Sequence, residues 1–229
     1  NSGDDTVSRI LLTTSSVDKT ISVGSSPTEI VWDGGSYVYV INSGDNTVSR
    51  ILTSTGTVDK TISVGANPSC IAWDGGSYVY VTNRGSDTVS RILISSGNVD
   101  ATISLPTGSI PEGIAWDHSN HMWVTCSGTN KIERIIISSV TLDTSYSVSN
   151  PSLVNYTDLN CMVISHDGSR IVSQMYIPTG DLIHNYTTYN NYPNGLYNFS
   201  YRTGNYFGAI AGDGYDGEHY LYIVPDGTA

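Results

Sequence analysis

The feature that most constrains this chain is a sequence unit that recurs about every forty residues. Trp32 and Trp73 are 41 positions apart, and Trp116 follows 43 positions later because the loop at 106–111 is longer. The unit is clear in the first 137 residues and fades after them. A period this short indicates one small supersecondary unit, and such units bury their apolar surface by stacking on their neighbours.

Each unit contains four short apolar runs separated by turn residues. In the best-preserved unit the runs are Ser69–Asp74, Ser77–Asn83, Thr88–Ile94 and Val99–Leu105. None of them has the length or the 3.6-residue spacing of a helix. A sheet that is apolar on both faces must be covered by neighbouring sheets, and closing the row into a ring removes the uncovered ends. We therefore predict an all-β fold, a β-propeller of four-stranded antiparallel blades.

The two ends of the chain are complementary halves of the unit. The first residues match its third and fourth strands, and the last residues match its first and second strands. We predict a single domain, 1–229, of five blades, closed by pairing of the N-terminal strands with the C-terminal hairpin. The predicted blades are 27–64, 68–105, 111–148, 160–203, and a composite of 206–224 with 5–23.

Charge limits the partners of the chain. Asp and Glu number 21 against 10 Lys and Arg, which gives a net charge of −11. An acidic surface disfavours nucleic acid, and no apolar run approaches the roughly 18 residues of a membrane span. We expect no nucleic-acid partner, no membrane insertion and no cofactor. The chain begins at Asn1 without Met, so we expect a processed or excerpted product.

Cysteines and sequons leave alternatives open. The three cysteines, Cys70, Cys126 and Cys161, have no metal-site spacing. They are interpreted as buried thiols, with a Cys126–Cys161 bridge as the alternative. Three Asn-X-Ser/Thr triplets are candidate glycosylation sites in a secreted context, although such triplets also arise by chance. They begin at Asn155, Asn185 and Asn198.

Two known propeller families resemble these units. Tyr80–Asn83 reads Tyr-Val-Thr-Asn, and a Val-Gly-x-x-Pro turn at 64–68 precedes its unit. These motifs resemble the YVTN repeat of surface-layer-type β-propellers. The segment from Ile110 to Ile135 is more similar to the repeat of streptogramin-lyase-like and NHL propellers. The resemblance implies a propeller fold, and because propellers host many functions it implies little about activity.

Several residue types recur at fixed places in the unit. The tryptophans are interpreted as packing between blades, with a sugar-binding platform as the alternative. An Arg in the third strand and an Asp near the start of the fourth are expected to pair across neighbouring strands, with a repeated ligand site as the alternative. These residues are Arg9, Arg50, Arg91 and Arg134, and Asp18, Asp59, Asp100 and Asp143.

Two further groups are weighed for chemistry. Asp213, Asp216 and Glu218 cluster in a Gly-rich stretch and form a weak Ca²⁺ candidate, against an ordinary solvated turn. His118 and His121 flank a turn in the unit that resembles lyases. A streptogramin-lyase-like enzyme would require one of them to meet an acid and a metal. The other interpretation is structural histidine.

Tyrosine is concentrated in the second half of the chain. Twelve of the sixteen tyrosines lie from Tyr146 onward, among Asn, Thr, Gly and Ser. This composition is typical of adaptable recognition surfaces. The candidate partner-binding residues are Tyr186, Tyr189, Asn190, Asn191, Tyr192, Tyr197 and Tyr201.

These observations predict a binding or structural module rather than an enzyme. No catalytic motif and no resident metal site are predicted from the sequence. We expect an extracellular, cell-surface or virion component that binds protein or glycan through propeller-face loops and the Tyr-rich blade, with self-association in an assembly. The alternatives are a lectin with one sugar site in each blade and a streptogramin-lyase-like enzyme.

Overall fold

The structure is a computed structural model. It describes residues 1–129, 131–147, 158–164, 171–176, 182–189, 196–203, 207–212 and 221–225, with side chains up to Asp143 except at residue 130, and at Ser145. The chain divides into two compact units, Asn1–Leu105 and Pro106–Ala229, and each is described by itself. No helix among these residues is long and apolar enough to cross a membrane.

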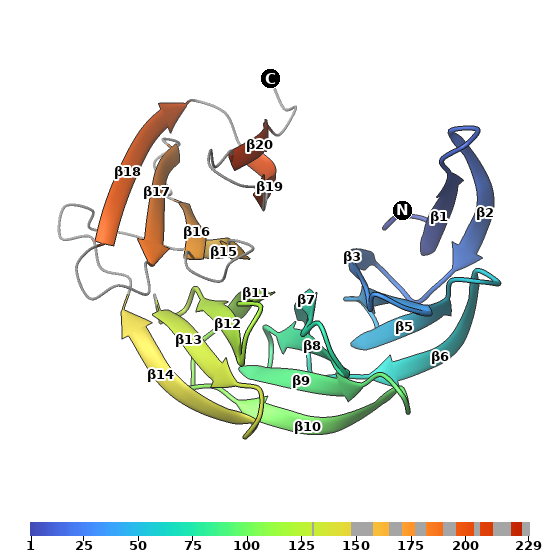
Figure 1. Cartoon of the computed structure of the whole chain (residues 1–229), viewed down its shortest axis with the longest axis horizontal. Helices are drawn as coiled ribbons and strands as arrows, with labels where there is room; N and C mark the ends of the chain where they lie inside the picture. The colour runs from blue at the N-terminus through green and yellow to red at the C-terminus, as the bar shows by residue number, and fades with distance from the viewer. Residues whose placement is uncertain are drawn as a thin grey trace. The chain divides into compact units, whose positions relative to one another are not determined.

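The first unit holds one two-stranded sheet and two four-stranded antiparallel sheets (Figure 1). The small sheet pairs β1 with β2, and the large sheets have the orders β3-β4-β5-β6 and β7-β8-β9-β10. The strands are β1 (Thr6–Leu11), β2 (Ser16–Ser22), β3 (Pro27–Trp32), β4 (Tyr37–Asn42), β5 (Thr47–Leu52), β6 (Thr57–Ser63), β7 (Pro68–Trp73), β8 (Tyr78–Asn83), β9 (Thr88–Leu93) and β10 (Asn98–Ser104).

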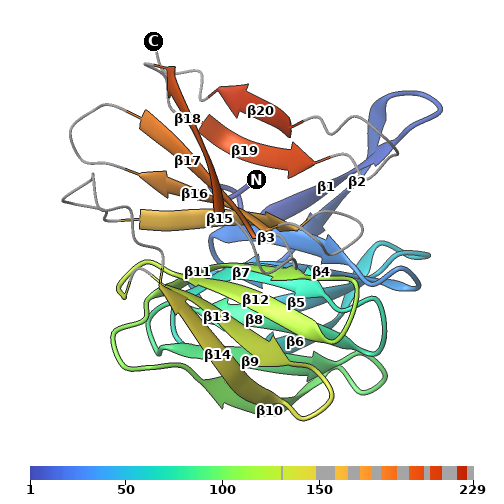
Figure 2. The same ribbon diagram turned by 60° about the vertical axis from the view of Figure 1, so that its left-hand side comes forward.

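The second unit begins with a four-stranded sheet of the same order, β11-β12-β13-β14. Three two-stranded sheets follow, β15-β16, β17-β18 and β19-β20 (Figure 2). The strands are β11 (Pro111–Trp116), β12 (His121–Cys126), β13 (Lys131–Ile136), β14 (Thr141–Ser147), β15 (Asp158–Ile164), β16 (Ile171–Tyr176), β17 (Leu182–Tyr189), β18 (Leu196–Thr203), β19 (Phe207–Gly212) and β20 (Leu221–Pro225).

The three clear sequence units are therefore confirmed as four-stranded antiparallel sheets. The predicted fourth blade is divided between the sheets β15-β16 and β17-β18, and the two halves of the predicted composite blade are separate two-stranded sheets. The count of five blades, the closure of the ring and the single domain remain predictions.

Register irregularities distinguish two kinds of hairpin. In a complete sheet the outer hairpin, made of the third and fourth strands, is shifted directly after the recurring Arg, as at Arg50 in β5-β6. The inner hairpin, made of the first and second strands, is shifted near its start, as at Pro68 in β7-β8. The sheet β1-β2 has the outer shift, after Arg9, and β19-β20 has the inner shift, after Phe207. The sheets β1-β2 and β19-β20 thus each have the pairing pattern of half a blade.

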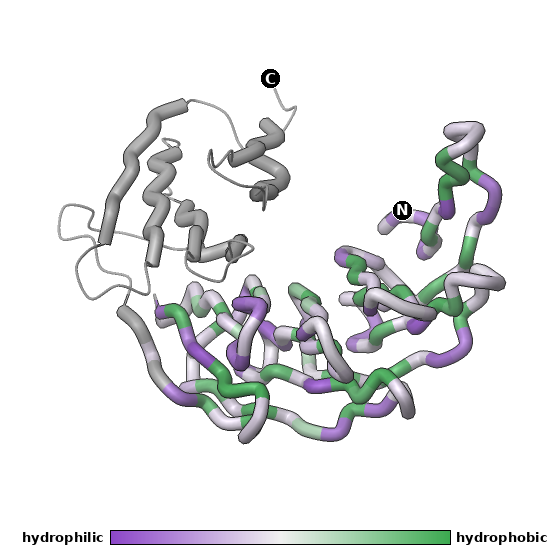
Figure 3. Tube along the Cα trace, in the orientation of Figure 1, coloured by the Kyte–Doolittle hydropathy of each residue, from purple (hydrophilic) through white to green (hydrophobic). Residues whose placement is uncertain are grey.

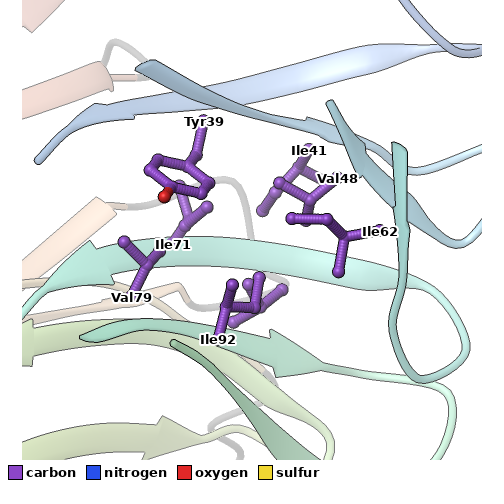
Figure 4. Close-up of a cluster of buried hydrophobic side chains, with 8 residues drawn as sticks. Tyr39, Ile41, Val48, Ile62, Ile71, Val79 and Ile92 are labelled. Atoms are coloured by element: carbon purple, nitrogen blue, oxygen red, sulfur yellow. The ribbon is translucent and has the colours of Figure 1, made fainter. Parts of the chain in front are cut away.

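The core of the first unit lies between consecutive sheets. Tyr39 of β4 lies beside Ile71 of β7 and Val79 of β8, and Ile41 belongs to the same buried cluster (Figure 4). Apolar stretches recur along these strands with polar residues between them (Figure 3). Large apolar residues alternate with others along each strand, so successive sheets bury one another. This arrangement confirms the packing interpretation for Trp73, which lies against the same cluster.

Candidate functional site

The turn between the first two strands of each complete sheet is built on one aspartate. Asp33 Oδ1 accepts the backbone N–H groups of Gly35 and Tyr37 at 2.9 and 3.0 Å. Asp74 binds its own turn in the same way. In the third sheet, Asp117 Oδ1 accepts the equivalent N–H groups, the second of them from His121 at 3.1 Å. The aspartate is thus a buried structural acceptor whose second oxygen remains available.

The third sheet uses that second oxygen differently from the others. His121 occupies the position that Tyr37 and Tyr78 hold in the other sheets. Its Nδ1 lies 2.7 Å from Asp117 Oδ2. Since the Asp117 side chain is only 10% exposed and the imidazole 27%, the pair is anchored inside while the ring reaches solvent. A carboxylate and an imidazole therefore meet at this turn.

The arginine of the third sheet stacks on a different residue from the arginines of the first two complete sheets, so the His121 ring is not its stacking partner. In the first unit, the guanidinium carbons of Arg50 and Arg91 lie 4.2 and 4.1 Å from the ring centroids of Tyr37 and Tyr78. In the third sheet the guanidinium of Arg134 instead lies over Trp123, at 5.5 Å. Trp123 is two residues after His121 in β12, on the same face of the strand. The arginine therefore stacks on Trp123.

His118 adds a second imidazole at the same turn. It has a φ of 58°, where the other turns have Gly34 and Gly75, both at 72°. A residue other than glycine is uncommon in this conformation, and such residues are often found at functional sites. The His118 ring lies 4.6 Å from the ring of Trp116, centroid to centroid, with an interplanar angle of 53°. The turn therefore presents an aromatic pair beside the aspartate–histidine pair.

The chemistry of the cluster follows from the hydrogen bond at Nδ1. When neutral His121 donates its Nδ1–H to Asp117, its Nε2 carries a lone pair. That atom can accept a hydrogen bond from a ligand hydroxyl, or remove a proton from a substrate. Among the residues described, no group of three or more His, Cys, Asp or Glu is placed to hold a metal ion. The contact between His121 and Asp117 meets one requirement of the lyase-like alternative, a histidine beside an acid. The other requirement, a metal ion, has no such group of ligands among the residues described.

The recurring Arg–Asp pairs are confirmed as structural. Arg50 Nε and Nη2 donate to the two oxygens of Asp59 at 3.0 and 2.6 Å. Arg91 binds Asp100 with the same geometry. The pairs at Arg9 and Arg134 are also formed. Arg50 in addition donates to the carbonyl of Ile94 in the next sheet. The pairs therefore join third and fourth strands and link sheets.

Repeated sugar sites are not supported by this geometry. The turn aspartates are at most 9% exposed, and one oxygen of each is used by its own turn. The indole N–H of each repeated tryptophan donates to a carbonyl of the same turn, at 3.0 to 3.1 Å. A lectin with one site per blade would need these groups to face a ligand. The recurring residues therefore maintain the architecture of the sheets.

The N-terminal end of the first unit leaves large apolar side chains uncovered. Ile30 and Trp32 of β3 are 55% and 57% exposed, although the equivalent Ile71 is only 6% exposed. Contiguous exposed apolar surface marks a place where something else packs. The other large apolar side chains exposed on β1, β2 and the turn between them are Ile10, Leu11, Leu12 and Val17.

Of the segment that contains the predicted Tyr-rich site, the structure describes the strands β17 and β18. The hairpin β17-β18 runs without a register shift from Leu182 to Tyr189, and pairs Tyr186 with Phe199 and Thr188 with Tyr197. Tyr201 lies opposite His184, and Asn185 and Asn198 lie in the two strands. The remaining candidates fall outside the described residues; they are Asn155, Asn190, Asn191, Tyr192, Asp213, Asp216 and Glu218. The binding, glycosylation and Ca²⁺ hypotheses remain predictions.

Comparison with known proteins finds structural similarity only. Neither a family model nor a curated protein matches the chain. Hydrazine synthase from Kuenenia stuttgartiensis is similar over 80% of this chain and 51% of that one, with 21% identity and a TM-score of 0.65. A streptogramin B lyase is similar over 74% and 55%, with 18% identity and a TM-score of 0.63. The chain thus spans about half the length of both.

A third structure covers nearly the whole chain. It is catalytically inactive virginiamycin B lyase from Staphylococcus aureus with quinupristin, similar over 97% of this chain and 71% of that one, with 16% identity and a TM-score of 0.68. These similarities support a β-propeller fold. The YVTN-repeat family is not identified by any match. The resemblance to streptogramin-lyase-like propellers is supported at the level of the fold.

The comparisons correct one prediction. The sequence led us to expect a protein that is not an enzyme, and this expectation is wrong: solved structures similar to the chain include lyases. The inference failed because it rested on missing sequence motifs, whereas a site is defined by the geometry and chemistry of specific residues. The Asp117–His121 pair was missed because Asp117 matches the repeated turn. The only sequence signal for the pair is that His121 stands at the position that Tyr37 and Tyr78 hold in the other units.

Proposed function

We propose that the chain is a β-propeller module of a cell surface, filament or virus particle that recognises glycan or protein outside the cell. The observation that carries this proposal is the cluster of Trp116, His118 and His121 around Asp117. The recurring polar residues are used within the sheets. At this one described turn, the recurring Gly and Tyr are replaced by groups that can contact a ligand.

The cluster suits the chemistry of a sugar better than that of an anionic ligand. Aromatic rings pack against the C–H faces of sugars, and an imidazole Nε2 accepts a hydrogen bond from a hydroxyl. The net charge of −11 on the whole chain disfavours an anionic ligand such as a phosphate. The proposal also includes the Tyr-rich hairpin β17-β18 and the propeller-face loops as further contact surfaces.

A glycan array with a repeat-restoring variant tests this proposal. His118→Gly combined with His121→Tyr recreates the turn of the second sheet, so folding is expected to be retained. The matched control is Tyr78→His, which places an imidazole at the same position of another sheet. We expect wild type and control to bind the same glycans and the double variant to lose them. Equal binding by all three proteins, or silence of the wild type on the array, would contradict a glycan site here.

A second candidate function is proton transfer at His121, of the kind a lyase requires. The specific observation is the 2.7 Å contact of His121 Nδ1 with Asp117, which suits Nε2 to act as a general base. Incubation with quinupristin, followed by chromatography and mass spectrometry, tests it. Consumption of quinupristin that disappears in His121→Gln would support catalysis, and no consumption by wild type would contradict it for this substrate.

The same proposal includes the finer architecture. The ring has five blades in one domain, and β1-β2 with β19-β20 form one of them. This closure is separate from ligand recognition, since the cluster at Asp117 lies within the single sheet β11-β14.

A further inference from the structure

A neutral polar network links the second and third strands of both complete sheets in the first unit. Asn83 Nδ2 donates to Thr88 Oγ1 at 3.0 Å and to Ser90 Oγ at 2.9 Å. The hydroxyl of Ser86 lies 3.0 Å from that of Thr88, so these four side chains gather on one face of β8 and β9. Asn42 makes the same two bonds in the sheet β3-β6. Every group in this network is uncharged.

The third sheet has different chemistry at the same four positions. The pairing register of β12 with β13 matches that of β8 with β9, and puts Cys126 opposite Lys131. The residues at the four positions are Cys126, Thr129, Lys131 and Glu133. A neutral network is therefore replaced by a set that includes one carboxyl group and one amino group.

Glu133 is the member of this set whose surroundings are the least complete. Its side chain is fully buried, and the hydroxyl of Ser145 donates to Oε2. The other oxygen, Oε1, is buried and has no hydrogen-bond partner among the residues described. A proton on Oε1 would not complete the site, because no acceptor lies within reach of that atom. A buried carboxylate needs a partner for its charge as well as for its lone pairs.

A second oxygen of the same set is in the same condition. Thr129 Oγ1 is buried without a hydrogen-bond partner in the described part of the chain. Thr129 holds the place of Ser86, whose hydroxyl belongs to the network of the second sheet. Gly128, the preceding residue, is exposed, so the turn gives access from solvent. Two oxygens that lack partners thus lie in one set of side chains next to the surface.

We propose that Glu133 Oε1 and Thr129 Oγ1 bind a monovalent metal cation, sodium or potassium. The charge of a single carboxylate is balanced by one monovalent ion. Carboxylate and hydroxyl oxygens are hard ligands, which suit such an ion. A divalent or transition-metal ion is disfavoured, because no group of three or more His, Cys, Asp or Glu among the described residues is placed to hold one. The site is at the opposite end of β12 from His121, and it is separate from the proposed ligand cluster.

Thermal unfolding of the full chain in three chloride salts tests the site. The salts are sodium, potassium and choline chloride at one ionic strength, and choline is too bulky for a site enclosed within a sheet. We expect the Tm of wild type to be about 2–4 °C higher in sodium or potassium than in choline, because the ion binds the folded chain alone. The larger of the two shifts identifies the preferred ion.

Two variants locate the effect. Glu133→Gln removes the charge and keeps an acceptor for Ser145, so we expect equal Tm values in the three salts. The matched control, Glu112→Gln, removes one carboxylate from the same sheet and is expected to keep the difference between salts. If Glu133→Gln does not fold, the combined variant Cys126→Asn, Lys131→Thr and Glu133→Ser restores the neutral network of the second sheet. That variant is also expected to lose the difference.

The line width of the ²³Na NMR signal gives a direct reading of binding. Wild type is expected to broaden the signal more than the combined variant does, and added potassium chloride is expected to narrow it by competition. Equal Tm values of wild type in all three salts would overturn the cation site and leave a water or a proton at Glu133. A salt difference retained by Glu133→Gln or by the combined variant would also overturn it, because the ion would then bind elsewhere. No readout uses a glycan or quinupristin, so the outcome is independent of the function proposed at His121.

Discussion

The sheets β7-β10 and β11-β14 share one backbone plan but differ in the chemistry of their side chains. Both have four antiparallel strands, an aspartate-bound turn and an Arg–Asp pair. In β8 the first residue, Tyr78, is a stacking partner of Arg91. In β12 the first residue, His121, contacts Asp117 instead. The difference teaches that a position used for stacking on arginine in one sheet holds an imidazole bound to a carboxylate in the other.

The second difference lies at the other end of the same strands. Asn83 Nδ2 donates to the hydroxyls of Thr88 and Ser90, which holds β8 to β9 by side chains. The third sheet has Cys126 in place of this asparagine, and the fully buried Glu133 in place of the serine. Glu133 accepts a hydrogen bond from Ser145. Where the second sheet has an asparagine side chain that bonds two strands together, the third sheet therefore has a buried carboxyl group.

The largest expected effect comes from the turn between the outer strands. Gly97 has a φ of 61°, and a Cβ there would lie 2.5 Å from Arg50 Nη1. The third sheet has Val140 at this place, with a φ of 58°. We expect Gly97→Val to lower the free energy of unfolding by about 2–3 kcal/mol through strain and displacement of the guanidinium. Urea denaturation measures it. Val140→Gly is the matched control, and a similar loss there would contradict the difference between the sheets.

The next effect tests the Arg–Asp pairs. The Arg50 side chain is 9% exposed and lies against Asp59 and Tyr37. Asp59→Asn leaves this guanidinium without its charged acceptor, so we expect a loss of about 1.5–3 kcal/mol in the free energy of unfolding. Asp18→Asn is the control, because Arg9 is 39% exposed and water replaces the lost contact. Equal losses in the two variants would mean that burial does not decide the strength of these pairs.

A smaller effect concerns alkaline pH. Burial raises the pKa of Tyr39 and of Tyr80 to about 12, with the neighbouring arginines opposing it. Between pH 10 and 12 the unfolded chain loses protons that the folded chain keeps, so stability is present below pH 10 and falls as the pH rises to 12. Each unit of pKa shift corresponds to about 1.4 kcal/mol. Denaturation at pH 9 and pH 11 should show a smaller loss in Tyr39→Phe and Tyr80→Phe than in wild type. If the two variants lost as much stability as wild type between pH 9 and pH 11, Tyr39 and Tyr80 would not be the cause of the alkaline loss.

The repeat made most of the first unit predictable. A 41-residue spacing, alternating apolar residues and Asp-Gly turns located β7 to β10 within one residue, and the recurring Arg and Asp predicted pairs that are formed. These features are local or repeated, so one sequence contains several copies of the same evidence. The Asp117–His121 contact was not predicted, because it depends on which side chain Arg134 stacks upon. The stacking partner of Arg134 depends on how the side chains pack, which the sequence pattern alone does not show.

The central claim is that Asp117 orients His121 so that Nε2 faces a ligand. ¹⁵N NMR of the imidazoles at neutral pH tests this most directly, with the His121 signals assigned by their loss in His121→Tyr. We predict the tautomer with the proton on Nδ1 in wild type and a mixture of tautomers in Asp117→Asn, whose amide can still bind the turn. A proton on Nε2 in wild type, or no change in Asp117→Asn, would contradict the account.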